Sequence, residues 1–406
     1  MEQVLYKLPD GWVWHSVKKL SHNIQYGHTA KAESNGNAKF LRITDIQDGK
    51  INWQGVPTVS LEEKEISKYA LNDDDLIFAR SGATAGKSIL IKNAPKDAVF
   101  ASYLIRIVPN KKDIIPEYLS YFFLTPAYWE VVGQNAAGAA QPNINGTKLS
   151  EFIVPVAPQC EQKRIVEKLD TLLTRIDTAI EHLQESVTLK NSLLQSALDG
   201  QFSAITDRMT IESLAEVKGG KRLPKGEKLS DEETEHPYIR VADFTDKGTI
   251  DLSGIKYVSK EIHKQIKRYV ISKDDLYISI AGTIGKTGFV PPELDGANLT
   301  ENAAKLVIRD KQQLDLSYLY LFTLTSDFSA QAGLATKTVA QPKLALTRLS
   351  KIEIPMCSLE EQKSLVSSIE ALKSKIHDAE AVLLGKIEDL ISLKASILDS
   401  AFKGEL

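Results

Sequence analysis

The hydrophobic positions of this chain form a helical stripe in two long segments. Within each segment apolar residues recur every three or four positions, which is typical of an amphipathic helix close to the coiled-coil repeat. The first stripe consists of Ile165, Leu169, Leu172, Ile176, Ile180, Leu183 and Val187. The second stripe consists of Ile369, Leu372, Ile376, Ala379, Leu383, Ile387 and Leu390. Each predicted helix has about 40 residues and spans roughly 60 Å. A helix with one apolar stripe needs another apolar surface to pack against, and for each predicted helix the other one is the obvious partner.

Short sequence signals predict where these helices begin and end. Ser358 and Glu361 form a Ser-x-x-Glu start signal, and Pro158 suits the opening of the first helix. Gly200 and Gly404 predict the two ends.

The helix ends also resemble each other, since LKNSLLQSALDGQF starts at Leu189 and LKASILDSAFKGEL starts at Leu393. This offset is four residues larger than the offset of 200 between the helix starts. We therefore expect the second helix to carry about one extra turn, or roughly 6 Å.

The stretches before the two helices repeat each other as well. QPNINGTKLSEFIVPVAPQCEQKRIVEKLD starts at Gln141, and QPKLALTRLSKIEIPMCSLEEQKSLVSSIE starts at Gln341. Three further blocks recur in the same order, starting at Lys39 and His236, at Ala70 and Val270, and at Pro116 and Leu316. Such repetition predicts two copies of one unit. The blocks alternate β-like runs with helix-like runs, which indicates an α/β class.

The order globule, helix, globule, helix predicts the architecture. We expect two α/β domains, related by a pseudo-twofold axis and separated by an antiparallel coiled coil of the two long helices. The predicted segments are residues 1–156 for the first domain, 157–202 for the first helix, 203–356 for the second domain and 357–406 for the second helix. Cys160 and Cys357 should then lie at opposite ends and form no disulfide.

Composition adds few constraints. The chain has 406 residues, a hydrophobic content of 43%, a charged content of 25%, two cysteines and a net charge of −3. No apolar run reaches membrane-spanning length and no export signal is visible, so a cytoplasmic location is expected. The net charge does not favour nucleic-acid binding, although binding requires only a local basic surface.

The motifs that suggest catalysis are weak. The segments 82–88 (GATAGKS) and 282–287 (GTIGKT) resemble a phosphate loop, but that loop needs four residues between its first glycine and Gly-Lys. A degenerate P-loop ATPase therefore remains a minor alternative to a tight turn between strands. Glu161 with Lys163 could suggest a nuclease motif, but an acidic residue in a first helical turn is commonly structural. We identify no candidate catalytic residue and no metal site.

The polar loops offer chemistry suited to reading DNA, because their side chains can contact base edges and phosphates. Polar loops are often simply solvent-facing, but these recur at equivalent places in both copies. The candidates in the first copy are Arg80, Ser81, Thr84, Lys87, Ser102, Tyr103, Gln141, Asn143, Asn145 and Lys148. The candidates in the second copy are Ser279, Thr283, Lys286, Thr300, Asn302, Lys337, Thr338, Gln341 and Lys343. The two sets differ in detail, as expected if each copy reads its own half-site.

The chain resembles the specificity subunits of type I restriction–modification systems. The resemblance rests on APQCEQKRIVEKLDTLLTRID, CSLEEQKSLVSSIEALKSKI, the two Gly-Lys loops and the Leu-Ser…Ile-Pro endings before each helix. It implies two target-recognition domains that bind a bipartite, asymmetric double-stranded DNA target, with a gap set by the helices. It implies no catalysis in this chain.

The same resemblance implies the partners. Two modification subunits would supply S-adenosylmethionine and adenine methylation, and restriction subunits would use ATP and Mg²⁺ to translocate and cleave DNA. Without these partners we expect weak DNA binding or poor solubility, because helix faces meant for them are exposed. The remaining alternative is a coiled-coil adaptor that joins two proteins without contacting DNA.

Overall fold

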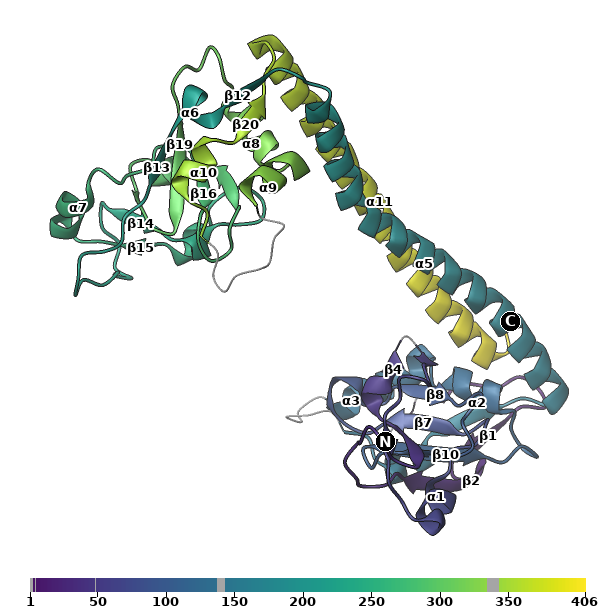
Figure 1. Ribbon diagram of the computed structural model, residues 1–406. Coiled ribbons are helices and arrows are strands. Elements are labelled where there is room, and N and C mark those ends of the chain that lie inside the picture. The colour runs from purple at the N-terminus through teal and green to yellow at the C-terminus, as the bar shows by residue number, and fades with distance from the viewer. Residues whose placement is uncertain (1–2, 4, 48, 137–142, 334–342) are drawn as a thin grey trace. The chain divides into compact units, whose positions relative to one another are not determined.

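The computed structural model describes residues 3, 5–47, 49–136, 143–333 and 343–406 (Figure 1). The chain divides into two compact units, residues 1–184 with 384–406 and residues 185–383. Each unit combines an α/β part with one portion of each long helix. The boundary between the units therefore falls inside the two helices.

The first unit is built on a four-stranded antiparallel sheet of order β2–β10–β7–β8. Its strands are β2 (Ser21–Tyr26), β10 (Leu104–Pro109), β7 (Leu76–Ala79) and β8 (Ser88–Leu90). The two central strands, β10 and β7, are almost completely buried, as expected for a sheet covered on both faces. Arg106 is the charged exception in β10. Its guanidinium lies 3.6 Å from the Asp75 carboxylate. Burial lowers the pKa of Arg106 and raises the pKa of Asp75.

The remaining elements of the first α/β part surround this sheet. A mixed sheet of order β6–β3–β9 contains one parallel pair, β3 with β9, and β1–β11 and β4–β5 form two antiparallel pairs. These strands are β1 (Val13–Ser16), β3 (Ala38–Leu41), β4 (Ile46–Gln47), β5 (Lys50–Ile51), β6 (Thr58–Val59), β9 (Ala98–Phe100) and β11 (Ile153–Val156). The helices are η1 (Ile43–Asp45), α1 (Glu63–Tyr69), η2 (Gly82–Thr84), α2 (Pro116–Phe122), α3 (Pro126–Ala136) and α4 (Gly146–Glu151).

The second unit repeats this plan with its own elements. Its sheets have the orders β13–β19–β16–β17, β15–β14–β18 and β12–β20. The strands are β12 (Arg208–Thr210), β13 (Ala215–Gly219), β14 (Pro237–Ile239), β15 (Lys256–Tyr257), β16 (Leu276–Ser279), β17 (Thr287–Phe289), β18 (Asn298–Leu299), β19 (Ala303–Ile308) and β20 (Glu353–Pro355). The helices are α6 (Ile211–Leu214), η3 (Val241–Asp243), η4 (Leu252–Gly254), α7 (Lys260–Ile266), η5 (Pro292–Leu294), α8 (Leu316–Thr323), α9 (Ser326–Ala332) and α10 (Leu346–Ser350).

The equivalence of the two α/β parts extends to individual contacts. The Tyr118 hydroxyl donates to the Pro155 carbonyl over 2.9 Å, and the Tyr318 hydroxyl donates to the Pro355 carbonyl over 2.7 Å. Both bonds tie the first helix after the main sheet to the last strand before a long helix. The α/β class and the two-copy organisation predicted from the repeat are therefore confirmed.

The two long helices have equal lengths. Helix α5 (Gln159–Ser203) and helix α11 (Leu359–Lys403) each contain 45 residues, and both ends are 200 positions apart. The expectation of an extra turn in the second helix is wrong. The structural match pairs Phe202 with Phe402, since Phe202 packs on Tyr318 and Phe402 packs on Tyr118. A shift of four residues is close to one helical turn and preserves the apolar face. The two sequences at the helix ends therefore resemble each other even when they are aligned four residues out of register.

The predicted helix signals are only partly correct. The Ser358–Glu361 start signal is confirmed: the Glu361 carboxylate accepts from the Ser358 backbone N–H over 2.9 Å, and the Glu361 N–H donates to the Ser358 hydroxyl over 3.3 Å. Gly404 follows the end of α11 with φ +75°, a conformation that favours glycine. Gly200, in contrast, lies inside α5, so its assignment as a helix end is wrong.

Two equivalent glutamines hold the starts of the long helices. Gln162 is 1% exposed, and its side chain accepts from the Ile115 N–H over 2.8 Å and donates to the Ala157 carbonyl over 2.8 Å. Gln362 is fully buried and makes the corresponding bonds with Asp315 and Cys357 over 2.9 and 3.0 Å. The repeated Glu-Gln of the sequence therefore marks a buried clamp between each helix and its α/β part.

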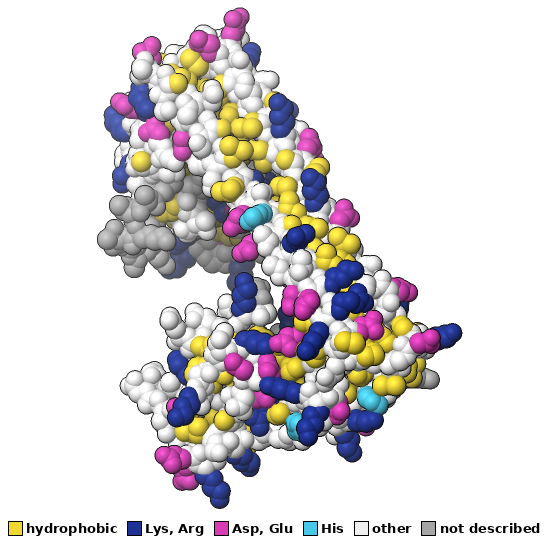
Figure 2. Space-filling view, turned by 90° about the vertical axis from the view of Figure 1, so that its right-hand side faces the viewer, with side chains coloured by type: hydrophobic (Ala, Val, Ile, Leu, Met, Phe, Trp, Pro, Cys, Tyr) yellow, Lys and Arg dark blue, Asp and Glu magenta, His cyan; other side chains and the backbone are white. Residues whose placement is uncertain are grey.

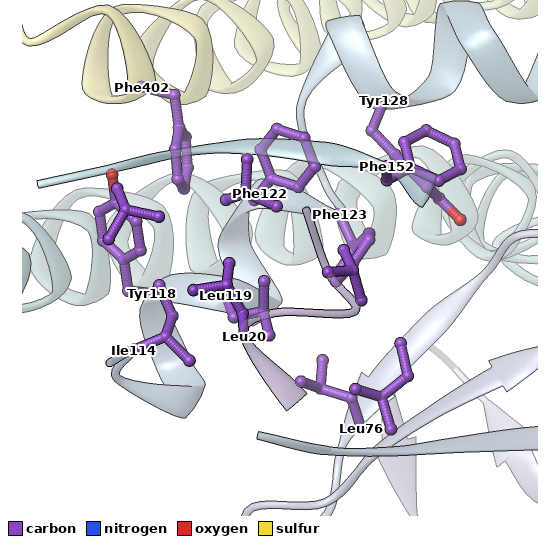
Figure 3. Close-up of a cluster of buried hydrophobic side chains, with 14 of the residues drawn as sticks. Leu20, Leu76, Ile114, Tyr118, Leu119, Phe122, Phe123, Tyr128, Phe152 and Phe402 are labelled. Atoms are coloured by element: carbon purple, nitrogen blue, oxygen red, sulfur yellow. The ribbon is translucent and has the colours of Figure 1, made fainter. Parts of the chain in front are cut away.

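The core of the first unit is closed by the last turns of α11. Phe402 packs among Tyr118, Leu119 and Phe122, with its ring centroid 4.8 Å from that of Tyr118 (Figure 3). The first turns of α5 join the same core through Ile165 and other residues of its stripe. Because the beginning of α5 packs with the end of α11, the helices run antiparallel here. The Lys394 ammonium binds the Asp177 carboxylate across this pair at 2.6 Å.

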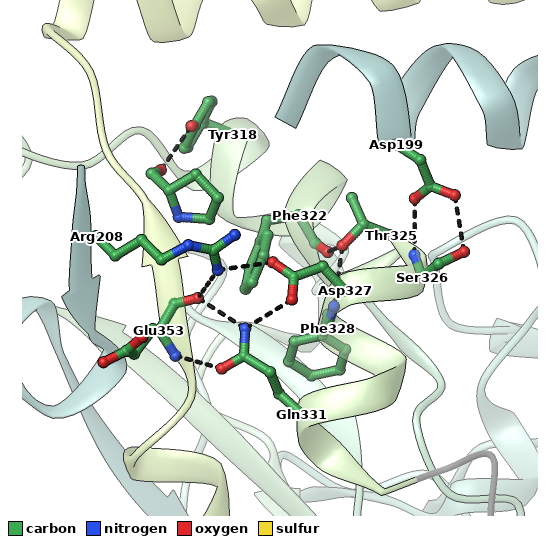
Figure 4. Close-up of polar contacts among 11 residues, drawn as sticks. Asp199, Arg208, Tyr318, Phe322, Thr325, Ser326, Asp327, Phe328, Gln331 and Glu353 are labelled. Atoms are coloured by element: carbon green, nitrogen blue, oxygen red, sulfur yellow. Dashed lines mark hydrogen bonds and ion pairs between the residues drawn. The ribbon is translucent and has the colours of Figure 1, made fainter. Parts of the chain in front are cut away.

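The second unit uses the opposite helix ends in the same way. The end of α5, with Leu198 and Phe202, shares a core with the beginning of α11, with Leu365 and Ile369. Polar bonds reinforce this arrangement (Figure 4): Asp199 accepts from the N–H of Ser326 over 2.8 Å and from its hydroxyl over 2.7 Å.

A second group of polar bonds in this unit fixes helix α9. Arg208 of β12 binds Asp327 of α9 at 2.8 Å. Gln331 of the same helix donates to the carbonyl of Glu353 over 3.0 Å and accepts from its N–H over 2.8 Å. These bonds join α9 to the β12–β20 pair (Figure 4).

Two further findings concern the whole described chain. Cys160 and Cys357 are both free thiols. In the part of the chain that the structure describes, no helix combines the length and the apolar character needed to cross a membrane.

Candidate nucleic-acid interface

Three of the predicted recognition loops meet at the end of strand β7 in the first unit. The Arg80 N–H donates to the carbonyl of Tyr103, in the loop between β9 and β10, over 3.0 Å. The Arg80 carbonyl accepts from the N–H of Ile144, just before α4, over 2.8 Å. Ser81 forms an isolated antiparallel bridge with Asn143. The three loops, which are distant from one another in the sequence, are thus brought together within the first unit, and Arg80 lies where they meet.

The loop that follows Arg80 is a hairpin connection between antiparallel strands β7 and β8. The Ala79 N–H donates to the Lys87 carbonyl, and the Gly86 N–H donates to the Ala79 carbonyl, both over 2.9 Å. Gly86 adopts φ +87°, which explains the glycine before the lysine. A phosphate loop instead opens a helix after a strand. The turn interpretation is therefore supported, and the ATPase alternative loses its basis.

Arg80 has an oriented but uncompensated side chain. Its guanidinium carbon lies 5.2 Å from the ring centroid of Tyr26. The Tyr26 hydroxyl accepts from the Gly146 N–H over 2.8 Å, which fixes the ring. No carboxylate pairs with Arg80 among the described residues, and Lys87 and Ser81 beside it are exposed. Such a guanidinium keeps its charge and its planar set of donors for a ligand.

The second loop carries Tyr103 and Ser102 beside a fixed arginine. The backbone N–H and the Nε of Arg42 donate to the Asp45 carboxylate over 2.8 and 3.1 Å, and Nη2 of Arg42 donates to the same carboxylate over 2.7 Å. The hydrogen bond to Asp45 raises the pKa of Arg42. Burial raises the pKa of the Tyr103 hydroxyl, and Arg42 acts in the opposite direction. Tyr103 is 39% exposed, so it remains available to a ligand.

The third loop is only partly free for binding. Asn143 is exposed, whereas the Asn145 side chain accepts from the Lys148 N–H over 2.8 Å and caps α4. Asn145 therefore has a structural task in addition to its predicted one. Gln141 lies outside the described residues.

In the second unit several predicted residues are engaged internally. Ser279 is fully buried; its hydroxyl donates to the Thr283 carbonyl and accepts from the Lys286 N–H over 2.8 Å. Lys286 lies 2.7 Å from Asp246. Thr300 is 6% exposed and bonds to Glu301 over 3.1 Å. In this arrangement Ser279 has no surface and Thr300 has almost none to offer DNA, because both side chains are buried within the loops.

The remaining predicted residues of the second unit lie at its surface or outside the described residues. Thr283, Asn302 and Lys343 are exposed. The Asn302 carbonyl accepts from the Ile280 N–H over 2.8 Å, as the Tyr103 carbonyl accepts from Arg80. Lys337, Thr338 and Gln341 fall outside the described residues.

Sequence reasoning missed the residues that frame the interface. Arg42 and its equivalent Arg240 make the same fork with Asp45 and Asp243, and Arg240 lies 2.6 Å from Asp243. The repeated Arg-x-x-Asp was visible in the blocks starting at Lys39 and His236, and it was the available signal. Tyr26 had no such signal, because its equivalent in the second unit is a glycine.

Comparison with known proteins identifies the family of this chain. The profile described as "Type I restriction modification DNA specificity domain" matches residues 22–190 and 206–388. The chain belongs to this family, and its role is therefore DNA sequence specificity.

Individual relatives match over nearly the full chain. The specificity subunit of the EcoBI enzyme of Escherichia coli is 26% identical, covering 99% of this chain and 88% of that protein. The StySPI specificity subunit of Salmonella potsdam is also 26% identical, covering 98% and 90%.

Two solved structures share the fold. One, from a study of complex assembly and conformational transition of the type I restriction–modification system, has a TM-score of 0.74 and 19% identity, and the match covers 99% of this chain and 100% of that chain. The HsdS subunit from Thermoanaerobacter tengcongensis has a TM-score of 0.60 and 20% identity, and the match covers 100% of both chains.

Proposed function

We propose that each α/β domain reads one half of a bipartite, asymmetric DNA target and that partner subunits carry out the chemistry. One observation carries the proposal: two domains with the same sheet order and the same backbone bonds present different side chains at equivalent loop positions. Arg80 in the first domain corresponds to the buried Ile280 in the second. A shared frame with different loops is what recognition of two different half-sites requires.

The chemistry belongs to other subunits in this proposal. Modification subunits bring S-adenosylmethionine and methylate adenine, and restriction subunits bring ATP-driven translocation and cleavage with Mg²⁺. Among the described residues no cluster of three or more histidine, cysteine or acidic side chains could hold a metal ion. In this proposal the chain is the non-catalytic recognition subunit, and it meets the DNA in the cytoplasm.

The long helices supply the surface for these partners in the proposal. In the second unit the exposed Leu189 and Leu193 line a groove together with Val187 and Ile376, and Val382 of α11 is also exposed. In the first unit Leu384, Ile391 and Leu393 are exposed on α11. Figure 2 shows hydrophobic side chains at the surface among charged ones. Apolar side chains at the surface of a helix favour binding to another protein.

Mapping methylated adenines tests the proposal. The host genome is sequenced for methylation with the chain and its modification partner, with the partner alone, and with a chain whose residues 1–156 come from a relative. We expect a two-part motif only when a specificity chain is present, and the exchange should change one half alone. An unchanged motif after the exchange would favour the adaptor alternative and contradict the proposal.

A further inference from the structure

Arg80 differs from the other arginines in the α/β part of the first unit. Arg42 is paired with Asp45 at 2.7 Å, and the buried Arg106 lies near Asp75. Arg80 stacks on Tyr26 and has no carboxylate partner within the described residues. Its backbone is held on both sides by the other two loops of the interface. The side chain therefore has a defined direction and an unneutralised charge.

The tyrosine beneath Arg80 is itself fixed. Tyr26 pairs with Ile105 in the main sheet, and its hydroxyl accepts from the Gly146 N–H over 2.8 Å. The Tyr26 side chain is 41% exposed, so the stacked pair reaches the surface. A guanidinium stacked on a fixed ring loses little additional freedom when it forms two parallel hydrogen bonds.

The second unit shows that this pair is not part of the common frame. The register of β13 with β19 places Gly219 where the first unit has Tyr26. The Ile280 carbonyl accepts from the Leu344 N–H, as the Arg80 carbonyl accepts from the Ile144 N–H, so Ile280 is the equivalent of Arg80. Ile280 is 2% exposed. Leu346 is the equivalent of Gly146, and its side chain lies close to the position that a Cβ atom at Gly219 would occupy. An apolar side chain therefore fills the space in the second unit that Tyr26 occupies in the first.

The contrast with Arg42 and Arg240 separates two kinds of contact. Arg42 and Arg240 recur with the same carboxylate fork, as expected for a task that both domains share, here fixing the turns η1 and η3. Arg80 has no counterpart of its kind, as expected for a task specific to one half-site. The commonest specific arginine contact to DNA is a pair of bonds to O6 and N7 of guanine in the major groove.

We propose that Arg80, oriented by Tyr26, reads a guanine in the half-site of the first domain through its O6 and N7 atoms. This inference rests on the proposed DNA-recognition function and adds a residue and a base to it. The second domain, with Ile280 and Gly219, recognises its half-site without this contact.

The experiment uses the chain with its modification subunits and DNA duplexes that carry the methylated motif. Each guanine of the first half-site is replaced in turn by 7-deazaguanine, which lacks the N7 acceptor. With the unchanged chain, one replacement should lower binding about tenfold. The Arg80→Ala and Arg80→Lys variants should bind the natural duplex more weakly and should no longer respond to that replacement. Lysine keeps the charge but lacks the fork.

A matched control removes a charge elsewhere in the same domain. Lys96 is an exposed lysine in the turn before β9, so Lys96→Ala should retain the full response to 7-deazaguanine. Replacements of guanine in the second half-site should affect the unchanged chain and both Arg80 variants equally.

Three results would overturn the inference and leave the proposed function standing. They are a first half-site without guanine, an Arg80→Ala variant that still responds to 7-deazaguanine, and an Arg80→Lys variant that binds and discriminates like the unchanged chain, as a phosphate contact would. If the unchanged chain directs methylation to no defined motif, the proposed function itself fails.

Discussion

The ring of Phe402 packs on the ring of Tyr118 with a centroid distance of 4.8 Å, although the two residues lie in distant parts of the sequence. Phe202 packs on Tyr318 in the same way at 4.9 Å. Each α/β core is thus completed by the end of a long helix that starts from the other domain. Folding of each domain and pairing of the helices are therefore coupled.

Phe402→Ala should destabilise the first unit, because it removes a large, fully enclosed side chain from its core. The expected cost is about 3–5 kcal/mol in free energy of unfolding. Hydrogen exchange, measured by mass spectrometry on the assembled complex, should show faster exchange in α2 and in the β1–β11 pair. Phe202→Ala is the matched control and should accelerate exchange around Tyr318 instead. Equal effects of both variants on both units would contradict the assignment of the two cores.

Replacing the buried glutamine of the first helix start should also reduce stability. Leucine in Gln162→Leu can neither accept from the Ile115 N–H nor donate to the Ala157 carbonyl, and each unsatisfied buried group costs about 1–3 kcal/mol. Denaturant unfolding checks this expectation. The exposed neighbour Gln159 provides the control, since Gln159→Ala should change the unfolding free energy by less than about 0.5 kcal/mol. Similar losses for both variants would show that the clamp is not important.

The start of α11 should respond to acid. Hydrogen bonds from Ser358 lower the pKa of Glu361 below its ordinary value of 4.5. A lowered pKa in the folded state means that the ionised carboxylate stabilises the fold above pH 4.5 and that this contribution is lost as the pH falls below it. Glu361→Gln has no such titration. Between pH 6 and pH 3 the melting temperature of the unchanged chain should therefore fall more than that of Glu361→Gln. A difference between the two melting temperatures that stays constant over this range would refute the capping role.

Lengthening both helices by one turn should change only the gap in the DNA target. Four residues inserted near Gln184 and four near Gly385 add roughly 6 Å of helix, or nearly two base pairs at about 3.4 Å each. Methylation mapping should show the same half-sites with a gap longer by one or two base pairs. An insertion in one helix alone makes the two helices unequal in length, so that their four ends can no longer all pack into the two cores, and it should abolish methylation. Altered half-sites after the double insertion would refute the separation of spacing from reading.

Much of the fold could be predicted because the repeat and the apolar stripes report on packing. The helices around Ile165 and Ile369 and the strands before them have the residue spacing that their burial requires. The error at the helix ends shows the limit of such patterns. A stripe repeats almost every four residues, so it defines the face of a helix better than its register. The bounds of the two helices give their equal lengths, and the contacts of Phe202 with Tyr318 and of Phe402 with Tyr118 identify the correct register.

The candidate interface was harder to predict, because loop residues leave no periodic pattern. The sequence indicated the loops around Arg80 and Tyr103, and the structure brings these loops together. It could not distinguish the exposed Ser81 from the buried Ser279, because burial depends on neighbours that are distant in sequence. Tyr26 was missed for the same reason: its contact with Arg80 is made across the sheet.

The closing of the first core by Leu398, Ala401 and Phe402 determines the order in which a nascent chain can reach its folded state. The second core needs α11 only as far as Ile369, so all of its residues are synthesised before those that close the first core. The first unit, although synthesised first, must wait with an open hydrophobic surface until residue 402 emerges. The amino-terminal half is thus the part of this protein most exposed to chaperones and proteases during translation.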